Sequence, residues 1–407
     1  MANALDVLQE RGFVEQVSDQ DGLRAALEQP TTFYIGYDPS AASLHAGSLL
    51  TVMAVAHLQR MGHRPIILVG GGTGMIGDPT GRTEMRQLMT VESIRSNVDA
   101  IRRQLSTYIE FDSDRAIIVN NADWLMQLGY IDFLRDIGQH FSVNRMLAAE
   151  AYRQRYERGL SFIEFNYQLL QAYDYLHLHR TYGCRLQLGG NDQWGNILAG
   201  VDLIRRIEGA ETFALTFPLL TTSSGAKMGK SASGAVWLQS ELLAPYDFYQ
   251  YWINVEDADV ARFLRLYTFL PMEQISDLCS VQGAALREAK AVLAYEVTRQ
   301  AHGDEAADQA REASKALFGG AGDRDAIPSS QVPAAELAEG VPLVDLLVTA
   351  GLCSSKSEAR RLVQQGGAYV NDQQVADLDR VITVEDLQDS EILLRAGKKR
   401  FHRIAIA

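Results

Sequence analysis

The sequence predicts an α/β protein built on a doubly wound parallel sheet of the Rossmann type, followed by a helical region and a small α+β region. Two observations support the sheet. A β-rich run over 31–37 and an apolar run over 64–69 are separated by a helical pattern, which is the strand–helix–strand unit of a parallel sheet. The second run is continuously apolar, as a strand buried on both faces should be, and it ends in the glycine-rich segment 70–74.

Length and composition set the broad class. The 407 residues suffice for two or three domains, and 47% of them are apolar. No apolar run reaches about 18 residues, so no transmembrane helix is expected, and the first residues lack the basic and apolar blocks of a signal peptide. Three scattered cysteines favour buried thiols in a reducing cytosol. We therefore expect a cytoplasmic protein, without a protein-bound metal because no metal-binding spacing of His or Cys occurs.

Charge is unevenly distributed along the chain. The net charge of −13 argues against a protein that simply coats nucleic acid, although it leaves room for an enzyme with local basic groups. Basic and acidic residues balance over 342–407, and five Lys/Arg fall between Arg395 and Arg403. This run fits either a contact with RNA or a solvated tail.

The first half of the chain alternates helices and strands. Residues 3–28 have apolar residues at helical spacing and are predicted as one helix. After the first strand, Asp38-Pro39 breaks the pattern and a polar turn follows over 40–43. A helix is then expected from about Leu44 to Met61, with Gly62 as its stop.

The connection from the first strand to this helix suits an anion. His45 and Gly47 are expected in the first helical turn, where unpaired backbone N–H groups favour negative charge. Gly47 has no side chain, so a phosphate or a planar ligand can approach the backbone. An ordinary strand-to-helix connection explains this spacing equally well.

The middle of the chain contains a second polar pattern. Residues 84–155 show a charged helical pattern interrupted by one strand over 116–119. A helix over 164–178 places Tyr167, Gln171 and Asp174 on one face, because they stand at i, i+4 and i+7. Such a face fits a polar pocket or a solvent-exposed stripe.

Two further strands and a mobile loop follow. Strands are expected over 185–188 and 213–220, separated by a helix over 194–207. Asp192 stands just after the first of them, where open α/β sheets bind ligands. Lys227 and Lys230 then lie three apart among small residues, a pattern that suits either the clamping of a polyphosphate or a solvated loop.

The last part of the chain divides by composition. Residues 233–317 are helix-rich, and 319–340 are rich in Gly, Pro, Ser and Ala, as expected of a linker. Residues 342–407 predict a helix–turn–helix with Ser354 and Ser355 as candidate caps, followed by hairpin strands.

Five segments together resemble the bacterial tyrosyl-tRNA synthetases. In chain order they are YDPSAASLHAGSLL, GGGTGMIGDPTGR, EFNYQLLQAYDYL, LGGNDQWGN and KMGKS. Of these, LHAGS and KMGKS are similar to the two signature motifs of class I aminoacyl-tRNA synthetases, usually written HIGH and KMSKS. The resemblance covers nearly the whole chain. It implies a tyrosine–tRNA ligase that converts L-tyrosine and ATP to tyrosyl-adenylate and pyrophosphate, then transfers tyrosine to the 3′ end of tRNA(Tyr).

The resemblance also implies a domain plan. It places a Rossmann-like catalytic domain over 1–225, with a helical dimerisation insertion at about 84–155. The KMSKS loop and an α-helical anticodon-stem-binding domain follow over 226–320. A linker over 321–341 then leads to a ribosomal-protein-S-four-like RNA-binding domain over 342–407. A homodimer is expected, and its candidate apolar contacts are Phe133, Ile137, Phe141, Val143 and Met146.

By the same resemblance, each part of the reaction has its residues. The catalytic set is Ser40, His45, Arg82, Arg86, Lys227, Lys230 and Ser231. The tyrosine-binding set is Tyr34 and Asp174 at the phenolic hydroxyl, Asp78, Tyr167 and Gln171 at the α-ammonium, and Asn121 and Trp124 along the pocket. The ATP-binding set is Asp38, Ser40, His45, Gly47, Ser48, Asp192, Gln193 and Lys230. The RNA-binding set is Lys356, Arg360, Arg361, Lys398, Lys399 and Arg400.

The chemistry explains these residue types. A tyrosine carboxylate is already ionised at neutral pH, so activation needs no strong base. It needs positioning and stabilisation of the charge that grows on the departing phosphates, which donors such as His, Ser and Lys supply. Mg²⁺ is expected to arrive with ATP and to be held through phosphate oxygens rather than by dedicated protein ligands.

Two departures from the family pattern keep alternatives open. Ser48 stands where HIGH has its second histidine, and a serine hydroxyl reaches less far and cannot carry charge. Ile35 offers no side-chain hydrogen bond to a ribose. Two alternative hypotheses are a catalytically impaired paralogue that binds RNA and a tryptophan-specific relative. The tryptophan hypothesis is disfavoured by the pair of Asp174 and Tyr34 and by the C-terminal region.

Overall fold

The computed structural model describes residues 3–39, 43–80, 91–112, 114–148, 152, 159–225, 228–231, 234–319, 327–388, 391–397 and 400–406. It divides into two compact units. The first comprises residues 1–228 and 261–280, and the second comprises residues 229–260 and 281–407. Segment 261–280 therefore belongs to the first unit, whereas the sequence suggested that 226–320 forms a single helical domain.

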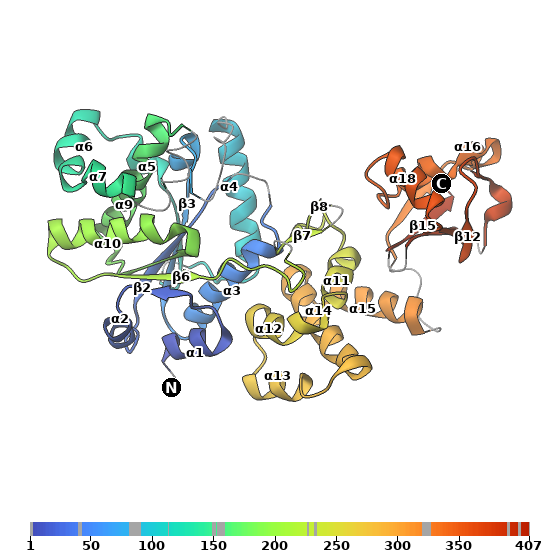
Figure 1. The fold of residues 1–407 in the computed structure, drawn as a ribbon, viewed down its shortest axis with the longest axis horizontal. Helices are drawn as coiled ribbons and strands as arrows, with labels where there is room; N and C mark the ends of the chain where they lie inside the picture. The colour runs from blue at the N-terminus through green and yellow to red at the C-terminus, as the bar shows by residue number, and fades with distance from the viewer. Residues whose placement is uncertain are drawn as a thin grey trace. The chain divides into compact units, whose positions relative to one another are not determined.

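A six-stranded sheet forms the centre of the first unit (Figure 1). Its strands, in spatial order, are β1 (Gln16–Val17), β6 (Phe213–Phe217), β5 (Leu186–Gly190), β2 (Thr32–Tyr37), β3 (Arg64–Val69) and β4 (Ile117–Asn120). All neighbours are parallel except β1, which runs antiparallel to β6. The chain builds β2, β3 and β4 outward in one direction and returns to build β5 and β6 in the other. This confirms the doubly wound sheet and puts its switch point between β2 and β5.

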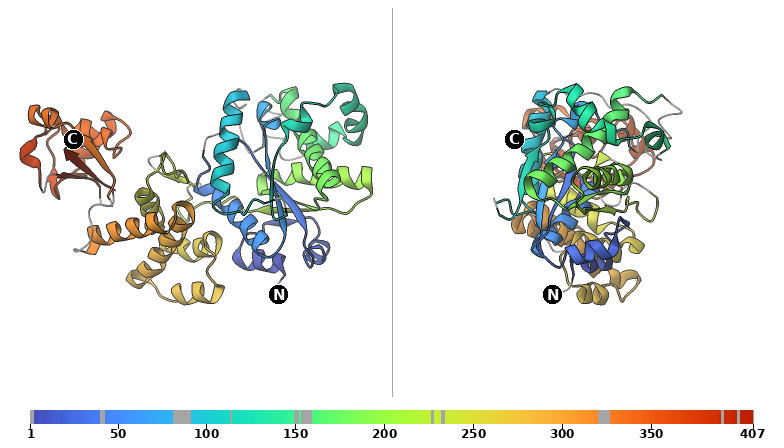
Figure 2. Two further views of the ribbon diagram at one scale, coloured as in Figure 1. Left: turned by 180° about the vertical axis from the view of Figure 1, so that it is seen from behind. Right: turned by 90° about the vertical axis from the view of Figure 1, so that its left-hand side faces the viewer.

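Helices cover both faces of this sheet (Figures 1 and 2). On one side lie α9 (Phe162–Tyr182) and α10 (Trp194–Glu208), and on the other lie α3 (Ala46–Arg60) and α4 (Val91–Leu105). The remaining elements are α1 (Ala4–Arg11), α2 (Gln20–Ala26), η1 (Thr73–Met75), α5 (Ala122–Leu125), α6 (Tyr130–Asp136), η2 (Gly138–His140), α7 (Val143–Ala148), η3 (Asn191–Gln193) and α13 (Met272–Leu278), with α12 (Asp257–Tyr267) ending in this unit.

The helix α9 is longer than the sequence pattern predicted. Ser161 and Glu164 form a reciprocal capping box at its start, and Gly183 ends it in the left-handed conformation. The helix therefore has 21 residues and extends past Leu178. It carries Tyr167, Gln171 and Asp174 across the carboxyl edge of the sheet.

The prediction of one helix over 3–28 was wrong. Gly12 ends α1 with φ 89° and donates its N–H to the last carbonyls of that helix. The chain then forms β1, which pairs with β6, before Asp19 caps the start of α2 by accepting from the Gly22 N–H. The apolar residues keep helical spacing across the break, which is why periodicity alone did not reveal it.

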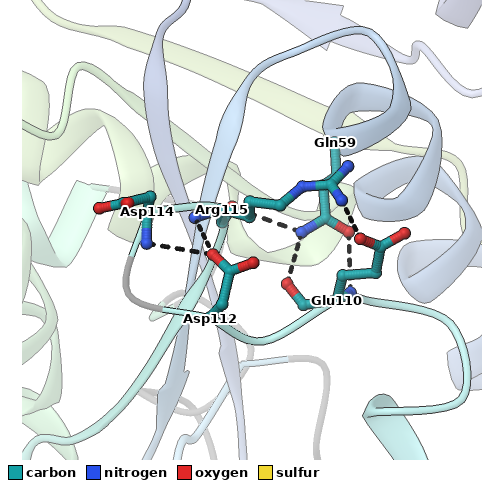
Figure 3. A network of polar contacts seen from close by, with 5 residues as sticks. All are labelled: Gln59, Glu110, Asp112, Asp114 and Arg115. Atoms are coloured by element: carbon teal, nitrogen blue, oxygen red, sulfur yellow. Dashed lines mark hydrogen bonds and ion pairs between the residues drawn. The ribbon is translucent and has the colours of Figure 1, made fainter.

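A polar network fixes the loop that leads into β4 (Figure 3). Gln59, buried near the end of α3, donates from Nε2 to the carbonyls of Glu110 (2.8 Å) and Arg115 (3.3 Å) and accepts from the Glu110 N–H (3.0 Å). Asp112 Oδ1 accepts from the N–H groups of Asp114 and Arg115. The Arg115 guanidinium pairs with Glu110. The loop is thereby tied to α3, which holds β4 in place beside β3.

The second unit contains helices and a small sheet. Its first elements are β7 (Lys230–Ser231), β8 (Gly234–Ala235), α11 (Pro245–Ile253), η4 (Gly283–Leu286), α14 (Arg287–His302) and α15 (Asp304–Gly319). A five-stranded sheet follows in the order β12 (Gln373–Val375), β11 (Ala368–Val370), β14 (Glu391–Ala396), β15 (Arg400–Ile406) and β9 (Ser329–Val332). Around it lie α16 (Ala334–Glu339), β10 (Val341–Pro342), α17 (Leu343–Thr349), α18 (Lys356–Gln364), β13 (Val381–Ile382) and η6 (Val384–Asp386).

The linker predicted over 321–341 is folded wherever the structure describes it. β9 pairs in parallel with β15, and α16 buries Leu337 in the core of the C-terminal sheet. Val332 and Val341 join the same core. Few apolar residues in a Gly-, Pro- and Ser-rich segment were enough, because a neighbouring strand supplies the backbone partners that the segment lacks locally.

The helix–turn–helix and hairpin predicted for the C-terminal region are confirmed. Ser355 caps α18 by accepting from the Glu358 N–H. The hairpin of β11 and β12 turns at Asn371 and Asp372, both with positive φ, as a tight two-residue turn requires. Within the described residues, no helix is both long and apolar enough to cross a membrane.

Arg11 explains why segment 261–280 belongs to the first unit. Its side chain is 7% exposed, and its guanidinium donates to three backbone carbonyls beyond the middle of α12. Nη1 lies 3.0 Å from the carbonyl oxygens of Arg265 and Thr268, and Nη2 lies 2.6 Å from that of Leu270. One side chain of α1 thus satisfies the end of a helix that is distant in sequence.

We expect Arg11→Ala to lower the free energy of unfolding by about 3 kcal/mol, because it leaves carbonyl oxygens without their charged donor. Urea unfolding followed by circular dichroism measures this. Arg24→Ala is the matched control, since Arg24 pairs with Asp6 on the surface (2.7 Å) and its loss should lower the free energy of unfolding much less than Arg11→Ala does. Equal losses in the two variants would contradict the role given to Arg11.

Candidate active site

Polar side chains gather where the parallel strands end. Asp38 follows β2, Asp78 lies in the loop after β3, Asn121 follows β4, and Asp192 follows β5. The carboxyl ends of parallel strands meet at one edge of a sheet, and these four strands lie next to one another around the switch point. The helix α9 adds Tyr167, Gln171 and Asp174, so most of the predicted tyrosine-binding set lies at one edge.

Asp174 is the most constrained charged group of this site. Its side chain is 2% exposed. Oδ1 accepts from Nε1 of Trp124 (2.7 Å), and Oδ2 accepts from Nδ2 of Asn121 (2.9 Å). Asn121 is itself held by the Gly72 N–H, which donates to its Oδ1 at 2.8 Å. A carboxylate has about four acceptor positions, so Asp174 can take another donor.

Burial dominates the electrostatics at Asp174. It raises the pKa of this carboxyl to about 7, while the hydrogen bonds from Asn121 and Trp124 act in the opposite direction. The two donors therefore favour the ionised form that the apolar surroundings disfavour. A further donor from a bound molecule would strengthen that preference.

Tyr34 lies in the central strand β2 and contributes a phenol. Its side chain is 2% exposed, its ring packs on Tyr175 with centroids 5.2 Å apart, and its hydroxyl has no hydrogen-bond partner among the described residues. Burial raises the pKa of this phenol, and the charge of Asp174 adds to the effect. A buried hydroxyl without a partner is costly, so this atom is suited to a polar ligand.

A second group of acceptors lies around Asp78. This carboxylate is 7% exposed, accepts from Nε2 of Gln193 (2.6 Å) and from the Thr80 N–H (2.8 Å), and has its pKa raised by burial. Nδ2 of Asn196 donates to Oε1 of Gln171 (3.1 Å) and of Gln193 (3.3 Å). Carboxylate and amide oxygens held this way suit a bound ammonium.

Thr73 links the two groups. Its hydroxyl accepts from Nδ2 of Asn121 at 3.0 Å and also hydrogen-bonds the phenol of Tyr167. Burial raises the pKa of Tyr167, with the charges of Asp38 and Asp78 adding to it. Thr73 and Asn196 were not among the predicted site residues. Thr73 lies inside the segment GGGTGMIGDPTGR and Asn196 inside the segment LGGNDQWGN. Their places in these two motifs were the sequence signal that could have identified them as site residues.

His45 caps the start of α3. Its Nδ1 accepts from the N–H groups of Gly47 (3.0 Å) and Ser48 (3.3 Å), so the ring proton is assigned to Nε2 in the neutral imidazole. The sequence had suggested that His45 lies in the first turn of the helix. In the structure it is the capping residue, directly before that turn. Its Nε2–H is a donor suited to a phosphate oxygen.

Gly47 is required by close packing. A Cβ at this position would lie 2.8 Å from the carbonyl oxygen of Met228 and 2.9 Å from Cε1 of His45. The backbone of the KMGKS segment at Met228 therefore touches the start of α3. The sequence predicted that a ligand could approach the backbone at Gly47. In the structure, the carbonyl group of Met228 lies in the space that a side chain at Gly47 would fill.

Two other glycines make room for the carboxylates at the strand ends. A Cβ on Gly70 would lie 2.7 Å from Oγ1 of Thr73 and 3.3 Å from Oδ1 of Asp38. A Cβ on Gly190 would lie 2.6 Å from Oδ1 of Asp192. Burial raises the pKa of Asp192. The sheet edge thus places both predicted nucleotide-contacting carboxylates against backbone that carries no side chain.

Several predicted site residues cannot be placed. Outside the described residues lie Ser40, Arg82, Arg86, Lys227, Lys398 and Lys399. For Lys230 and Ser231 the structure describes the backbone, which forms β7. Among the described residues, no group of three or more His, Cys, Asp and Glu is arranged to hold a metal ion.

The basic residues of the C-terminal region divide into two kinds. Lys356, Arg360 and Arg361 are exposed on α18, and Lys356 pairs with Asp345 at 2.7 Å. Arg400 is half-buried and donates to the carbonyl of Leu352 at 2.6 Å. Arg400 is therefore tied to the fold, whereas the α18 residues face outward.

Two family models match the chain. The model described as tRNA synthetases class I (W and Y) matches residues 26–319, and the model of the tyrosine–tRNA ligase SYY-like C-terminal domain matches residues 325–404. The second match begins ahead of residue 342, in agreement with the strand β9 and the helix α16.

Relatives and solved structures match over long stretches. The tyrosine–tRNA ligase of Desulfosudis oleivorans is 55% identical over 99% of both chains, and that of Clostridium botulinum strain 657 is 54% identical over 100% of both. A C-terminally truncated mitochondrial tyrosyl-tRNA synthetase of Aspergillus nidulans is 31% identical with a TM-score of 0.71, covering 78% of this chain and 95% of that one. A tryptophanyl-tRNA synthetase of Encephalitozoon cuniculi shares the fold. It is 14% identical with a TM-score of 0.57, and the match covers 75% of this chain and 87% of that one.

The raised pKa of Asp174 predicts a pH dependence of stability. Below about pH 4 the carboxyl is protonated in both the folded and unfolded states. As the pH rises from about 4 to about 7, the carboxyl ionises in the unfolded chain while it stays protonated in the folded protein, so the folded state loses stability. We expect Asp174→Asn to gain stability relative to wild type over this range, by at most about 4 kcal/mol. Unfolding by urea at several pH values measures the difference.

The exposed neighbour Asp123 provides the control for this prediction. Asp123→Asn makes the same chemical change outside the buried site. Its stability difference from wild type should stay constant between pH 4 and pH 7. A constant difference for Asp174→Asn as well would contradict burial of an ionising carboxyl.

Proposed function

Because the chain belongs to the class I tRNA synthetase family of the tyrosine and tryptophan enzymes, we propose that it acts as a tyrosine–tRNA ligase. One observation carries the choice of tyrosine. Asp174 has spare acceptor capacity, and the buried Tyr34 hydroxyl has no partner within the described part of the chain. A phenolic O–H can donate to Asp174 and accept from Tyr34, which gives both groups what they lack.

Selectivity against phenylalanine follows from the same pair. Without the substrate hydroxyl, Tyr34 would stay unpaired and Asp174 would lose a donor in a buried pocket. Tyrosyl-tRNA synthetase is itself the established example of this rule, with a discrimination of about 10⁵ that belongs to that example and not to this structure. At the other end of the substrate, the acceptors of Asp78, Tyr167 and Gln171 would hold the α-ammonium.

Activation is proposed to proceed by positioning. The tyrosine carboxylate attacks the α-phosphate of ATP, forming a bond to phosphorus while the bond to pyrophosphate breaks. The Nε2–H of His45 would donate to a phosphate oxygen at the start of α3, and Ser40 is proposed as a second donor to the phosphates. Lys227, Lys230, Arg82 and Arg86 would neutralise the departing pyrophosphate. Mg²⁺ would be held by the phosphates of ATP.

The remaining ATP contacts are proposed on position. Asp38, Asp192 and Gln193 stand at the strand ends beside the tyrosine site, where they would contact the nucleoside and the adenylate. Ser48 would donate to a ribose or phosphate oxygen over a shorter reach than a histidine. The hydroxyl of Thr51, which donates to the Ser48 carbonyl at 2.8 Å, is held one turn further along α3.

The tRNA is proposed to contact the second unit. Lys356, Arg360 and Arg361 present positive charge on α18. Lys398, Lys399 and Arg400, which follow β14 in the sequence, are proposed as further contacts. Contacts of this kind fix the position of an RNA backbone. Because tRNA and ATP are substrates, we propose the cytoplasm as the place of action.

A homodimer is proposed through the apolar surface of the insertion. Within the insertion, Met126, Tyr130, Ile131 and Val143 are between 55% and 71% exposed. Exposed apolar side chains of this size are a common feature of protein interfaces. Of the five contacts predicted from sequence, Val143 is exposed, whereas Ile137 and Met146 are buried within the unit itself.

We expect Ile131→Asp to convert the dimer into monomers, since a carboxylate would be buried without a partner at the interface. Sedimentation velocity measures the change. Leu242→Asp is the control, because Leu242 is 50% exposed but lies in the second unit. A dimer that survives Ile131→Asp would move the interface elsewhere.

Amino-acid-dependent ATP–pyrophosphate exchange tests the proposed function. We expect exchange with tyrosine and none above background with phenylalanine, tryptophan or no amino acid. Exchange with tryptophan alone would favour the tryptophan-specific reading. A folded protein that binds tRNA but shows no exchange would favour the impaired paralogue, with Ser48 as the first suspect.

A further inference from the structure

His177 stands one turn beyond Asp174 on α9, and both residues contact the indole of Trp124. Its imidazole is stacked on the indole of Trp124, with ring centroids 4.3 Å apart and an interplanar angle of 19°. The same indole donates from Nε1 to Oδ1 of Asp174 at 2.7 Å. Asp174 and His177 are at i and i+3, so one helix face holds both the acceptor of the indole and its stacking partner.

Trp124 needs such a partner because of where it lies. It belongs to α5, a helix of four residues at the end of β4, and its neighbours Asp123 and Met126 are exposed. Beside the indole is a cavity of about 420 Å³ that His177, Tyr173 and Tyr182 also line. An indole beside open space and on so short a helix is not fixed by its backbone alone.

We propose that His177 is a positioning residue for amino-acid specificity. The stack sets the plane of Trp124, and that plane directs Nε1–H at Asp174. Oδ2 of Asp174 in turn accepts from Asn121, and the remaining acceptor positions of the carboxylate are directed toward the substrate. This inference rests on the proposed tyrosine-activating function and adds to it a residue that does not touch the substrate.

The state of the imidazole agrees with this role. Burial lowers the pKa of His177, and the charge of Arg180 lowers it further, so the ring is neutral near pH 7. Asp123, Tyr173 and Tyr182 line the same cavity as His177, and the centroid of the Tyr173 ring lies 6.4 Å from that of the imidazole. A neutral imidazole parallel to an indole at this distance gains offset-stacking energy without the desolvation of a charge.

The first test compares His177→Ala with wild type in tyrosine- and phenylalanine-dependent pyrophosphate exchange, using the full chain. We expect the ratio of kcat/KM for tyrosine over phenylalanine to fall roughly three- to tenfold, the range that a stacked aromatic pair contributes. The change should fall on the KM for tyrosine, while the KM for ATP stays constant. His177→Phe should restore the ratio, because a phenyl ring can still stack. An unchanged ratio in His177→Ala would overturn the inference.

His179 supplies a matched control on the same helix. It is also half-buried, but its Nδ1 hydrogen-bonds the carbonyl of Cys184 (2.9 Å) at the end of α9. His179→Ala should lower the melting temperature and leave the tyrosine-to-phenylalanine ratio as it is. If both alanine variants lower that ratio equally, the effect of His177 is general destabilisation, and the positioning role is wrong.

A double-mutant cycle separates positioning from other effects. Trp124→Phe keeps an aromatic ring but removes the N–H donor to Asp174. His177→Ala should add little further loss of selectivity in that background, because the path from His177 to Asp174 is already cut. Fully additive losses would overturn the proposal. Where His177→Ala does not fold, His177→Leu tests the same loss of stacking with a larger side chain.

The proposed function and this inference fail separately. Absence of tyrosine-dependent exchange in the wild-type protein would reject tyrosine activation itself. Normal exchange in the wild type together with an unchanged ratio in His177→Ala would reject only the positioning role.

Discussion

The site depends on one buried carboxylate, Asp174. In an apolar interior an ionised carboxylate is stable only where donors surround it, and here Asn121 and Trp124 supply them from a different part of the chain. Asn121 directly follows β4 and Trp124 lies in α5, whereas Asp174 belongs to α9. The hydrogen bonds therefore fix the helix relative to the edge of the sheet. The same arrangement leaves acceptor capacity beside the unpaired hydroxyl of Tyr34.

The doubly wound sheet makes this arrangement possible. Its switch point brings the ends of β2, β3, β4 and β5 to one edge, and glycines at the loop starts let polar side chains approach closely. The start of α3 lies at the same edge with His45 as its cap. Polar groups that recognise an amino acid and backbone dipoles that favour phosphates are thus neighbours because of topology.

Periodicity and motif order predicted most of the architecture. The central strands, α3, α10 and the C-terminal helix–turn–helix appear near the expected residues, because each has a strong local pattern. The prediction of one helix over 3–28 was wrong because Gly12 ends the first helix and β1 pairs with β6, although the apolar spacing continues across this break. The prediction of a linker was wrong over 327–341, because β9 is stabilised by β15, a strand about 70 residues away. Neither interruption is visible in a window of local sequence.

The sequence by itself determined the fold class, the order of the motifs, and the polar face of Tyr167, Gln171 and Asp174, because these depend on spacing along the chain. Only the tertiary structure decided which donors satisfy Asp174, that Thr73 and Asn196 join the site, and that His177 stacks on Trp124. The physical reason is that hydrogen bonds and ring contacts depend on distances between side chains from separate elements. Those distances are set by the packing of α5 and α9 against the sheet, which no single segment encodes.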